Sequence, residues 1–457
     1  MNVLFRTLQV LFGFAVLVIG CGGALWWVPR VTAAPTPTPT TGRVSTGARL
    51  PRMTVIGRSV EGRPIEAYHF GAGERKLVFV GATHGGPERN TQQLARMLID
   101  WYSTHPEEIP VGVRLDIIPV LNPDGDVRDS RQNANGVDLN RNMDTSRDGC
   151  VENDWQTTVY GAGGILVDTG GPYADSEPES RVIRSYLLDA AAVIFVHSDA
   201  GLVFPPACED PVSIAFAQAY AAGAGYEYAR YWDKYHITGG MHDWARGVDL
   251  PAVIPELLTG EDPEFEQNLN GMRAVFHNAD VLIPAPSFRT VDGVTMPLPI
   301  WRFWRAHGAD IFGPPLQSAA LVDGRYIQEF ATARVAYDST TLVDTVTLLP
   351  VTSVAEPGSP VAALDDADRI TNATNPFVVL DAFARFYRRV DGETTLGIPL
   401  SDEQTVEAAA PDTTVQRFEF GVLRYDSAAN RIVREPVVWQ EAARTALSES
   451  PLQFQIR

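Results

Sequence analysis

Four residues with metal-binding or acid–base side chains lie at the ends of hydrophobic segments that are typical of β-strands. His84 follows KLVFVGAT, with Glu88 four residues later, His197 follows AAVIFV, and Glu256 lies near the end of LPAVIPEL. Two histidines and one carboxylate form a known catalytic zinc set, which leaves a coordination position open for water. Zinc lowers the pKa of a bound water, and a nearby carboxylate can accept its proton. These residues therefore predict a hydrolytic zinc site.

The elements that must position these residues are strands alternating with amphipathic stretches over residues 53–285, a pattern typical of an α/β sheet covered by helices. Strands are predicted over 76–83, 114–122, 191–196 and 250–257. A helix should follow the first strand, with Pro87 in its first turn and Leu94, Leu98 and Trp101 on one face. Ligands of open α/β sheets bind outside the carboxyl ends of the strands, so the four site residues should converge there.

Several motifs of this segment resemble those of the zinc carboxypeptidase family, also called funnelins or metallocarboxypeptidases. In the family's order they are THGGPERNT, LNPDGDVRDSRQNANGVDLNRN, YGAGG with SEPESR, VIFVHS, ITGGMHDW and PAVIPEL. The resemblance covers residues 55–285. It implies an α/β fold with a mixed, mostly parallel central sheet covered by helices, and hydrolysis of C-terminal peptide bonds with one Zn²⁺ per chain.

The resemblance also implies the roles of individual residues in catalysis. His84, Glu88 and His197 would bind the zinc ion. Glu256, on PAVIPEL, would be the general base and acid. Arg131, in DSRQNAN, would polarise the scissile carbonyl and stabilise the oxyanion.

Three further residues are expected from the resemblance to contact the peptide substrate. Asn140 and Arg141, in DLNRN, would hold the terminal carboxylate, which a guanidinium can bind with two parallel hydrogen bonds. Tyr235 would close over the bound substrate. The alternative for Tyr235 is a core aromatic residue, because three other aromatic residues lie within seven positions of it.

Two positions depart from the family's pattern. The common spacing is His-x-x-Glu, whereas one more residue separates His84 from Glu88. Gly85 and Gly86 could absorb it in the turn, and the alternative is that Glu88 misses the metal. His242 falls at the usual floor of the specificity pocket and is neither apolar nor acidic, so the sequence predicts no side-chain preference.

The N-terminal segment differs in charge from the rest of the chain. The 457 residues carry a formal net charge of −19, which argues against nucleic-acid binding through phosphate neutralisation. The first 60 residues hold six arginines and no acid, so the remainder carries −25. Residues 7–28 contain no charge and are long enough to span a bilayer. Three interpretations stay open: a retained membrane anchor, a signal peptide cleaved before Ala34, and a lipoprotein signal with lipidation at Cys21.

The Pro/Thr-rich stretch that follows favours an exported protein, membrane-anchored or secreted, with its catalytic domain outside the cytoplasm. In an oxidising compartment Cys150 and Cys208 could pair, and unpaired buried thiols are the alternative. The predicted organisation is a signal or anchor at 1–33, a linker at 34–50, a catalytic domain at 51–288 and a C-terminal region at 289–457.

The C-terminal region contains an internal repeat of short strands and helices, at about 301–338 and 384–426. Matched pairs in the two copies are Gly313 with Gly397, Gln328 with Gln416, and Tyr337 with Tyr425. The repeat is either a structural appendage with an aromatic core or a module that binds a cell-surface polymer.

The sequence predicts a zinc metallocarboxypeptidase that acts on peptides at or outside the cell surface. One alternative is an amidase or peptidase for peptidoglycan stem peptides, because RQNANGVDLNRN also recurs in such family members. A second alternative is a catalytically weak binding protein on the same fold, which the longer spacing between His84 and Glu88 motivates.

Overall fold

A computed structural model describes residues 51–161, 164–350, 359–360, 368–372, 375–405, 414–426 and 430–436. The leader and linker predictions concern residues 1–50 and therefore lie outside the described residues. Within the described part of the chain, no helix combines the length and the hydrophobicity needed to cross a membrane.

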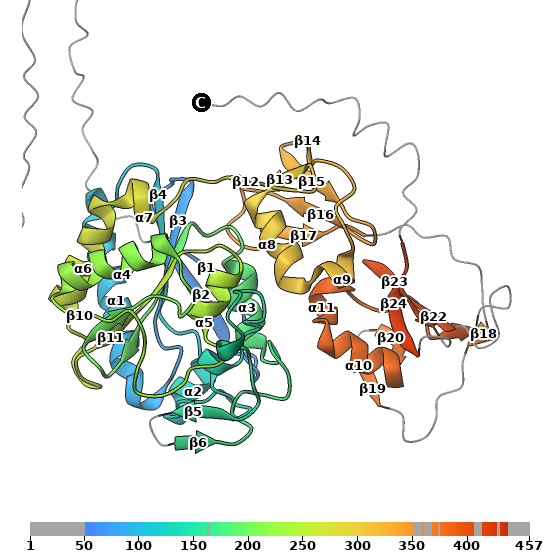
Figure 1. The fold of residues 1–457 in the computed structure, drawn as a ribbon, viewed down its shortest axis with the longest axis horizontal. Helices are drawn as coiled ribbons and strands as arrows, with labels where there is room; N and C mark the ends of the chain where they lie inside the picture. The colour runs from blue at the N-terminus through green and yellow to red at the C-terminus, as the bar shows by residue number, and fades with distance from the viewer. Residues whose placement is uncertain are drawn as a thin grey trace, which may run out of the picture. The chain divides into compact units, whose positions relative to one another are not determined.

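A central sheet organises the first half of the described chain (Figure 1). Its strands, in spatial order, are β1 (Arg52–Arg58), β2 (Pro64–Phe70), β4 (Val113–Ile118), β3 (Arg75–Val80), β7 (Ala192–Phe195), β11 (Ala252–Leu257), β9 (Leu202–Phe204) and β10 (Glu227–Tyr228). The short strand β8 (His197–Ser198) pairs with β11. Neighbours from β4 to β11 run parallel, while β1, β2 and β9 add antiparallel pairs. The predicted mixed, mostly parallel sheet is confirmed.

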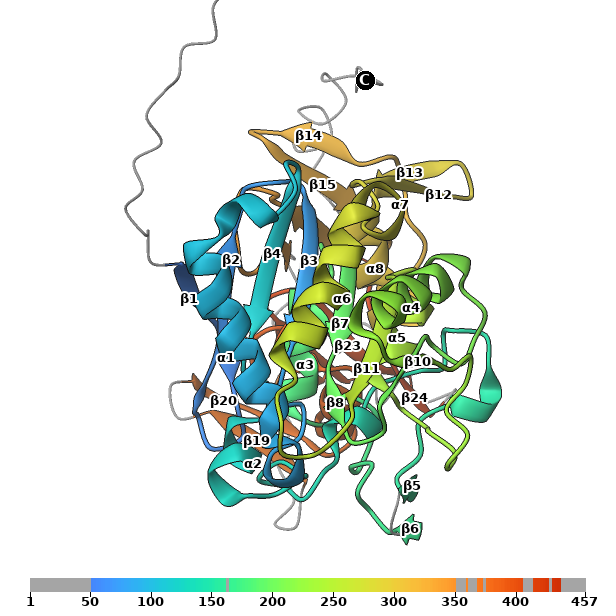
Figure 2. The same cartoon turned by 90° about the vertical axis from the view of Figure 1, so that its left-hand side faces the viewer.

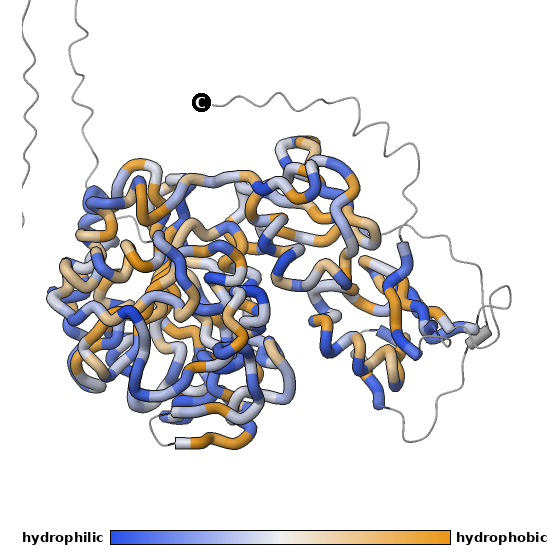
Figure 3. The backbone as a smooth tube through the Cα atoms, in the orientation of Figure 1, coloured by the Kyte–Doolittle hydropathy of each residue, from blue (hydrophilic) through white to orange (hydrophobic). Residues whose placement is uncertain are grey.

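Helices cover both faces of this sheet because its central strands are apolar on both sides. Leu77 and Phe79 of β3 belong to one core cluster, and Val78 and Val80 to the other, as the two-residue period of a strand requires. The first cluster packs under α1 (Arg89–Thr104), α4 (Pro211–Ala224) and α6 (Phe265–His277), which lie together in front of the sheet in Figure 2. The second packs under α3 (Pro178–Tyr186) and α5 (Met241–Gly247). Hydrophobic segments accordingly run through the interior of this region (Figure 3).

All four predicted strands exist, but the first two are clearly shorter than expected at their carboxyl ends. β3 ends at Val80 and β4 at Ile118, whereas strands to residues 83 and 122 were expected. After Val80 the backbone turns away from the sheet, and Ala82 has a positive φ of 40°. Asn122 caps the short helix α2 (Pro123–Arg128) by accepting a hydrogen bond from Gly125 N. His84, Glu88 and Asn122 therefore lie beyond the ends of β3 and β4.

The C-terminal region forms two small units of helices and short antiparallel strands, orange and red in Figure 1. The first contains β12 (Phe288–Val291), β13 (Val294–Pro297), α8 (Leu298–His307), α9 (Ala309–Phe312), β14 (Ala320–Val322), β15 (Arg325–Glu329), β16 (Arg334–Tyr337) and β17 (Val346–Leu348). The second contains β18 (Ser359–Pro360), β19 (Arg369–Asn372), β20 (Asn375–Leu380), α10 (Asp381–Arg389), α11 (Gly392–Thr395), β21 (Gln404–Thr405), β22 (Thr414–Phe418), β23 (Gly421–Asp426) and β24 (Arg431–Arg434).

The two units make the same contact at the matched glycines. Trp304 of α8 donates its indole N–H to the carbonyl of Gly313 at 2.9 Å. Tyr387 of α10 donates its hydroxyl to the carbonyl of Gly397 at 3.1 Å. In each unit an aromatic residue of the longer helix thus holds the turn after the shorter one.

Candidate metal centre and active site

Two histidines and one carboxylate converge just beyond β3 and β7. His84 Nδ1 lies 2.8 Å from Glu88 Oε1, and His197 Nδ1 lies 2.9 Å from Glu88 Oε2. All three side chains are buried, and their potential ligand atoms lie within 4.8 Å of one another. Nδ1 of each imidazole faces the same carboxylate, and the three groups are close enough together to hold one metal ion.

Glu88 reaches this point through a turn built on two glycines. Gly86 has a φ of +59°, a conformation that residues with a side chain rarely adopt. A Cβ atom at Gly85 would lie 2.3 Å from the carbonyl carbon of Gly125, so the backbones approach too closely for any side chain. A single 3-10 turn, Gly86–Glu88, then presents the carboxylate. The turn accommodates the extra residue and brings Glu88 beside both histidines.

Asp138 completes this centre, although it was not predicted from the sequence. Its Oδ1 lies 2.9 Å from Nε2 of His84, and its Oδ2 accepts a hydrogen bond from Nε of Arg131 at 2.9 Å. Burial opposes ionisation, but Arg131 and His84 hold the pKa of Asp138 well below its ordinary value. A carboxylate behind an imidazole fixes the ring and leaves its other nitrogen free for a metal. The available signal was its place in DLNRN, two residues before Asn140.

The chemistry of these residues fits a catalytic zinc ion. Two imidazoles and one carboxylate are a known donor set for such an ion, and Asp138 supplies the acceptor behind His84. Burial lowers the pKa of His197 to about 4, although Glu88 opposes the shift. Its imidazole is therefore neutral near pH 7, the protonation state that metal coordination requires.

The residues expected to perform acid–base and electrostatic catalysis lie beside the metal ligands. Glu256 on β11 is the strand partner of His197 on β8, and it lines a cavity of about 340 Å³ together with Arg131 and Glu88. Burial, and then repulsion from Glu88, raise the pKa of Glu256 to about 8. This pKa would fall if a cation were held at the adjacent ligands, because the ionised carboxylate would be stabilised. Arg131 donates to Glu88 at 2.5 Å as well as to Asp138.

The residues expected to bind the substrate line the same cavity. Asn140 is oriented by the backbone N–H of Met241, which donates to its Oδ1 at 2.9 Å. Arg141 is buried and donates from Nη1 to the carbonyl of Asn140 at 2.7 Å, while its Nε has no partner among the described residues. The guanidinium carbon lies 5.7 Å from the ring centroid of the half-buried Tyr235. A buried guanidinium on the cavity wall suits an anionic group of a ligand.

Other parts of the cavity wall were not expected. Asp199, Trp232 and Lys234 line it, and the β5–β6 hairpin (Val159–Gly161 and Gly164–Leu166) adds apolar atoms. His242, which was placed at the pocket floor, is not among the lining residues. It is buried behind the wall, with its ring edge-on to Phe204 at 5.4 Å between centroids. The wall therefore presents Phe204 instead of His242.

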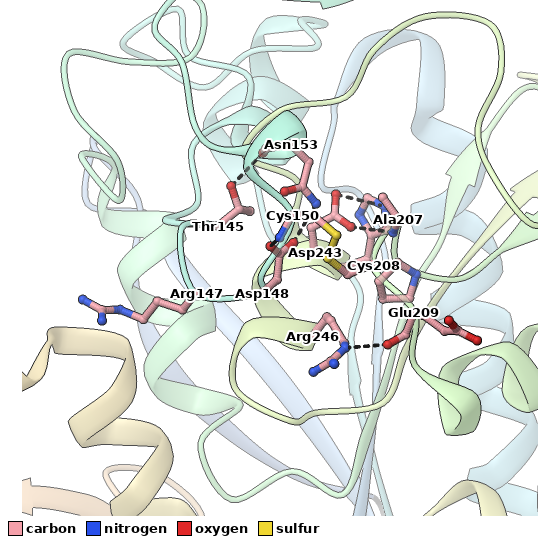
Figure 4. The surroundings of a disulfide bond; sticks show 12 residues. Thr145, Arg147, Asp148, Cys150, Asn153, Ala207, Cys208, Glu209, Asp243 and Arg246 are labelled. Carbon is pink, nitrogen blue, oxygen red and sulfur yellow. Dashed lines mark hydrogen bonds and ion pairs between the residues drawn. A yellow bond between two sulfur atoms is a disulfide. The ribbon is translucent and has the colours of Figure 1, made fainter.

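A disulfide joins Cys150 to Cys208, across 58 residues of sequence and with 5.9 Å between the Cα atoms. Figure 4 shows it beside Asp148 and Asp243, which accept hydrogen bonds from backbone N–H groups on either side of the bond. Of the two alternatives left open by the sequence, the structure has the paired cysteines. The bond connects the segment that follows Arg141 to the loop before α4.

Comparison with known proteins gives a match to one protein family and relatives that are named as an amidase and a carboxypeptidase. Residues 46–254 match the protein family described as zinc carboxypeptidase. Murein peptide amidase A of Escherichia coli (strain K12) is 26% identical over 261 residues, covering 53% of this chain and 98% of that protein. Carboxypeptidase SOL1 of Arabidopsis thaliana is 33% identical over 107 residues, covering 21% of this chain and 22% of that protein.

Solved structures of similar proteins include two with these activities in their names. The murein-tripeptide amidase MpaA from Escherichia coli O157 has 22% identity and a TM-score of 0.37, covering 55% of this chain and 99% of that one. Carboxypeptidase A from Helicoverpa armigera has 20% identity and a TM-score of 0.40, covering 51% and 69%. Residues 46–254, a little under half of this chain, therefore match the zinc carboxypeptidase family, a family of zinc-dependent hydrolases.

Proposed function

We propose that this protein is a zinc metallocarboxypeptidase that hydrolyses the peptide bond before a C-terminal residue with a free carboxylate. One observation carries the proposal. A single cavity of about 340 Å³ is lined by metal ligands, an acid–base candidate, an oxyanion-stabilising candidate and a carboxylate-binding pair, namely Glu88, His197, Glu256, Arg131, Asn140 and Arg141. This combination is what cleavage next to an anionic chain end requires.

The residues divide the chemistry between them. A zinc ion held by His84, Glu88 and His197 would supply a Lewis acid and a water of lowered pKa. Glu256 accepts the proton of the attacking water and returns it to the leaving amine. Arg131 stabilises the negative charge that develops on the carbonyl oxygen. The carboxylate-binding pair orients the chain end so that the scissile bond faces these groups.

Replacing Glu256 by glutamine tests this mechanism, because the variant keeps the shape of the side chain and removes the base. We expect the zinc content to stay at one per chain and kcat for a peptide panel to fall by about 10²–10⁴-fold. Glu261→Gln, an exposed carboxylate on the loop after β11, is the matched control and should change neither quantity. Wild-type turnover in Glu256→Gln would show that the mechanism is wrong.

A peptidoglycan stem-peptide amidase is the second candidate. Its support is the alignment with murein peptide amidase A of Escherichia coli, which spans 98% of that protein, against 22% of Carboxypeptidase SOL1. Purified muropeptides and linear peptides, compared by mass spectrometry of the products, separate the two candidates. A higher kcat/KM for muropeptides than for every linear peptide would favour the amidase. Stoichiometric zinc without hydrolysis of either class would favour a binding protein.

We also propose that the enzyme is membrane-anchored or secreted, with the catalytic domain outside the cytoplasm. The Cys150–Cys208 bond supports this location, because disulfides persist mainly in oxidising compartments. The C-terminal repeats are proposed to contact a cell-surface polymer. Cosedimentation of the full chain with purified cell walls tests that contact, and no enrichment in the pellet would argue against it.

A further inference from the structure

The carboxylate-binding pair is Asn140 and Arg141, and the loop that carries it (the carboxylate-binding loop) is hydrogen-bonded to residues 170–177. Asn142, the residue after Arg141, is fully buried. Its side-chain amide donates to the carbonyl of Gly170 at 2.9 Å, and its own carbonyl accepts a hydrogen bond from Asp175 N at 2.6 Å. Any displacement of Asp175 therefore acts on the backbone directly beside Arg141.

Asp175 in turn is tied to the C-terminal region through an arginine. Its Oδ1 accepts from the backbone N–H of Asp144 at 3.3 Å, and its Oδ2 pairs with Nη1 of Arg184 on α3 at 2.5 Å. Nη2 of the same guanidinium pairs with the carboxylate of Asp391, the residue at the start of α11 in the second repeat unit. Arg181 of α3 adds a contact of 3.4 Å to Asp391.

The bridge from Asp391 through Arg184 to Asp175 is buried along its whole length. The side chains of Arg184 and of both aspartates are at most 8% exposed. Loss of one partner from a buried ionic group costs more than loss of an exposed pair, because water cannot readily replace the missing contact. Without Asp391, one side of the guanidinium has no counter-charge, and the pairing with Asp175 must readjust.

The first repeat unit also contacts the catalytic region, at Arg147 further along the chain from Arg141 and at Gly247. Arg305 of α8 donates from Nη2 to the carbonyl of Arg147 at 2.6 Å and from Nε to the carbonyl of Gly247 at 2.5 Å. Gly247 ends α5, the helix whose first residue, Met241, orients Asn140. Both repeat units therefore bind segments that contact the carboxylate-binding pair.

We propose that the C-terminal region positions the carboxylate-binding loop, with Asp391 acting through Arg184 and Asp175 on Arg141. Asp391 is then a positioning residue of the active site, although it belongs to a different part of the chain and touches no substrate. This inference rests on the proposed function, because it assumes that Arg141 binds the terminal carboxylate. It predicts that the repeats influence substrate affinity rather than the chemical step.

Asp391→Asn in the full-length, zinc-loaded protein tests the proposal. Calorimetry would measure the Kd of two zinc-directed inhibitors, a benzylsuccinate that carries a terminal carboxylate and acetohydroxamate, which has none. We expect the benzylsuccinate Kd and the peptide KM to rise about 3- to 30-fold, with kcat, zinc content and the acetohydroxamate Kd unchanged. Asp368→Asn is the matched control, because Asp368 pairs with Arg388 inside the second unit and is 36% exposed.

Two outcomes overturn the proposal: unchanged binding of both inhibitors, or equal weakening of both, which would indicate general destabilisation. If Asp391→Asn does not fold, Asp391→Glu retains the charge and displaces the carboxylate by one methylene, with the same expected selectivity. Arg141→Met separates this inference from the proposed function. If Arg141→Met leaves benzylsuccinate binding unchanged, the proposed anchor and the positioning role both fail. If it weakens binding while the Asp391 variants do not, only the positioning role fails.

Discussion

Arg131 in the catalytic region and two buried arginines in the C-terminal region are stabilised by different kinds of hydrogen-bond partner. Arg131, beside the metal ligands, donates to the carboxylates of Glu88 and Asp138. Arg302 of α8 donates instead to four backbone carbonyls of the catalytic region, those of Leu188, Ala190, Val248 and Asp249. Arg434 of β24 likewise donates to the carbonyls of Thr395 and Phe420.

The pKa values of these residues reflect the two kinds of partner. Burial lowers the pKa of Arg302 to about 10 and that of Arg434 to about 9, because carbonyl dipoles compensate a buried charge less than carboxylates do. Burial acts on Arg131 too, but Asp138 and Glu88 raise its pKa above the ordinary value. Side-chain partners such as those of Arg131 can be exchanged for a metal or a substrate, whereas Arg302 and Arg434 join backbone segments that are packed against each other. Variants at the candidate metal site should therefore affect catalysis, whereas variants at the carbonyl-bound arginines Arg302 and Arg434 should affect stability.

The largest effect is expected at the metal ligands, where partners are side chains. His197→Ala removes one of three zinc donors, so the zinc content should fall well below one per chain and kcat/KM by about 10³-fold or more. Metal analysis and peptide hydrolysis measure both. Glu256→Gln, which should keep zinc, is the control. Full zinc occupancy in His197→Ala would contradict the assigned ligand set.

The second-largest effect is expected on stability, when the disulfide within the catalytic region is removed. Replacing Cys150 and Cys208 together by serine releases a loop of 58 residues, which should lower the free energy of unfolding by about 4 kcal/mol in the chain-entropy model. Denaturant unfolding measures the change, and a reducing agent should destabilise the wild type but not the variant. Equal stability of both proteins would mean that the crosslink does not constrain the unfolded chain.

A smaller loss of stability is expected when Arg302, which donates hydrogen bonds to backbone carbonyls, is replaced. Arg302→Met leaves four buried carbonyls without this donor and should cost about 3 kcal/mol of stability, while kcat of the folded enzyme stays unchanged. Thermal and denaturant unfolding measure the loss. Arg325→Met, at an exposed position of β15, is the control and should change stability by less than about 0.5 kcal/mol. A fall in kcat of Arg302→Met without a loss of stability would show that this arginine acts on catalysis and not on stability.

The smallest effect compares the two repeat units with each other. Gln328 and Gln416 are fully buried, and each side-chain amide donates to two backbone carbonyls. Gln328→Leu and Gln416→Leu should therefore each cost about 1 kcal/mol, with nearly equal losses. Unequal losses in denaturant unfolding would show that the matched glutamines do not have equivalent roles.

The amino-acid sequence by itself indicated the strands that carry the site and the residue types at their ends. A run such as KLVFVGAT is apolar on both faces, so it predicts a central strand without knowledge of its neighbours. The motif order then indicated the family and placed His84, Glu88, His197 and Glu256 in one site. The positions of the leader and linker, the domain limits and the location of the protein stay predictions.

The tertiary structure alone decided which residues are partners. Asp138 supports His84 from 54 positions away, Cys150 pairs with Cys208, and Arg184 meets Asp391 across 207 positions. Local sequence patterns report the periodicity of burial along a strand or helix, but a hydrogen bond or an ion pair depends on how separate elements pack. For this reason the candidate zinc ligands could be predicted from the sequence, whereas the network that holds them and the loop of Asn140 and Arg141 could not.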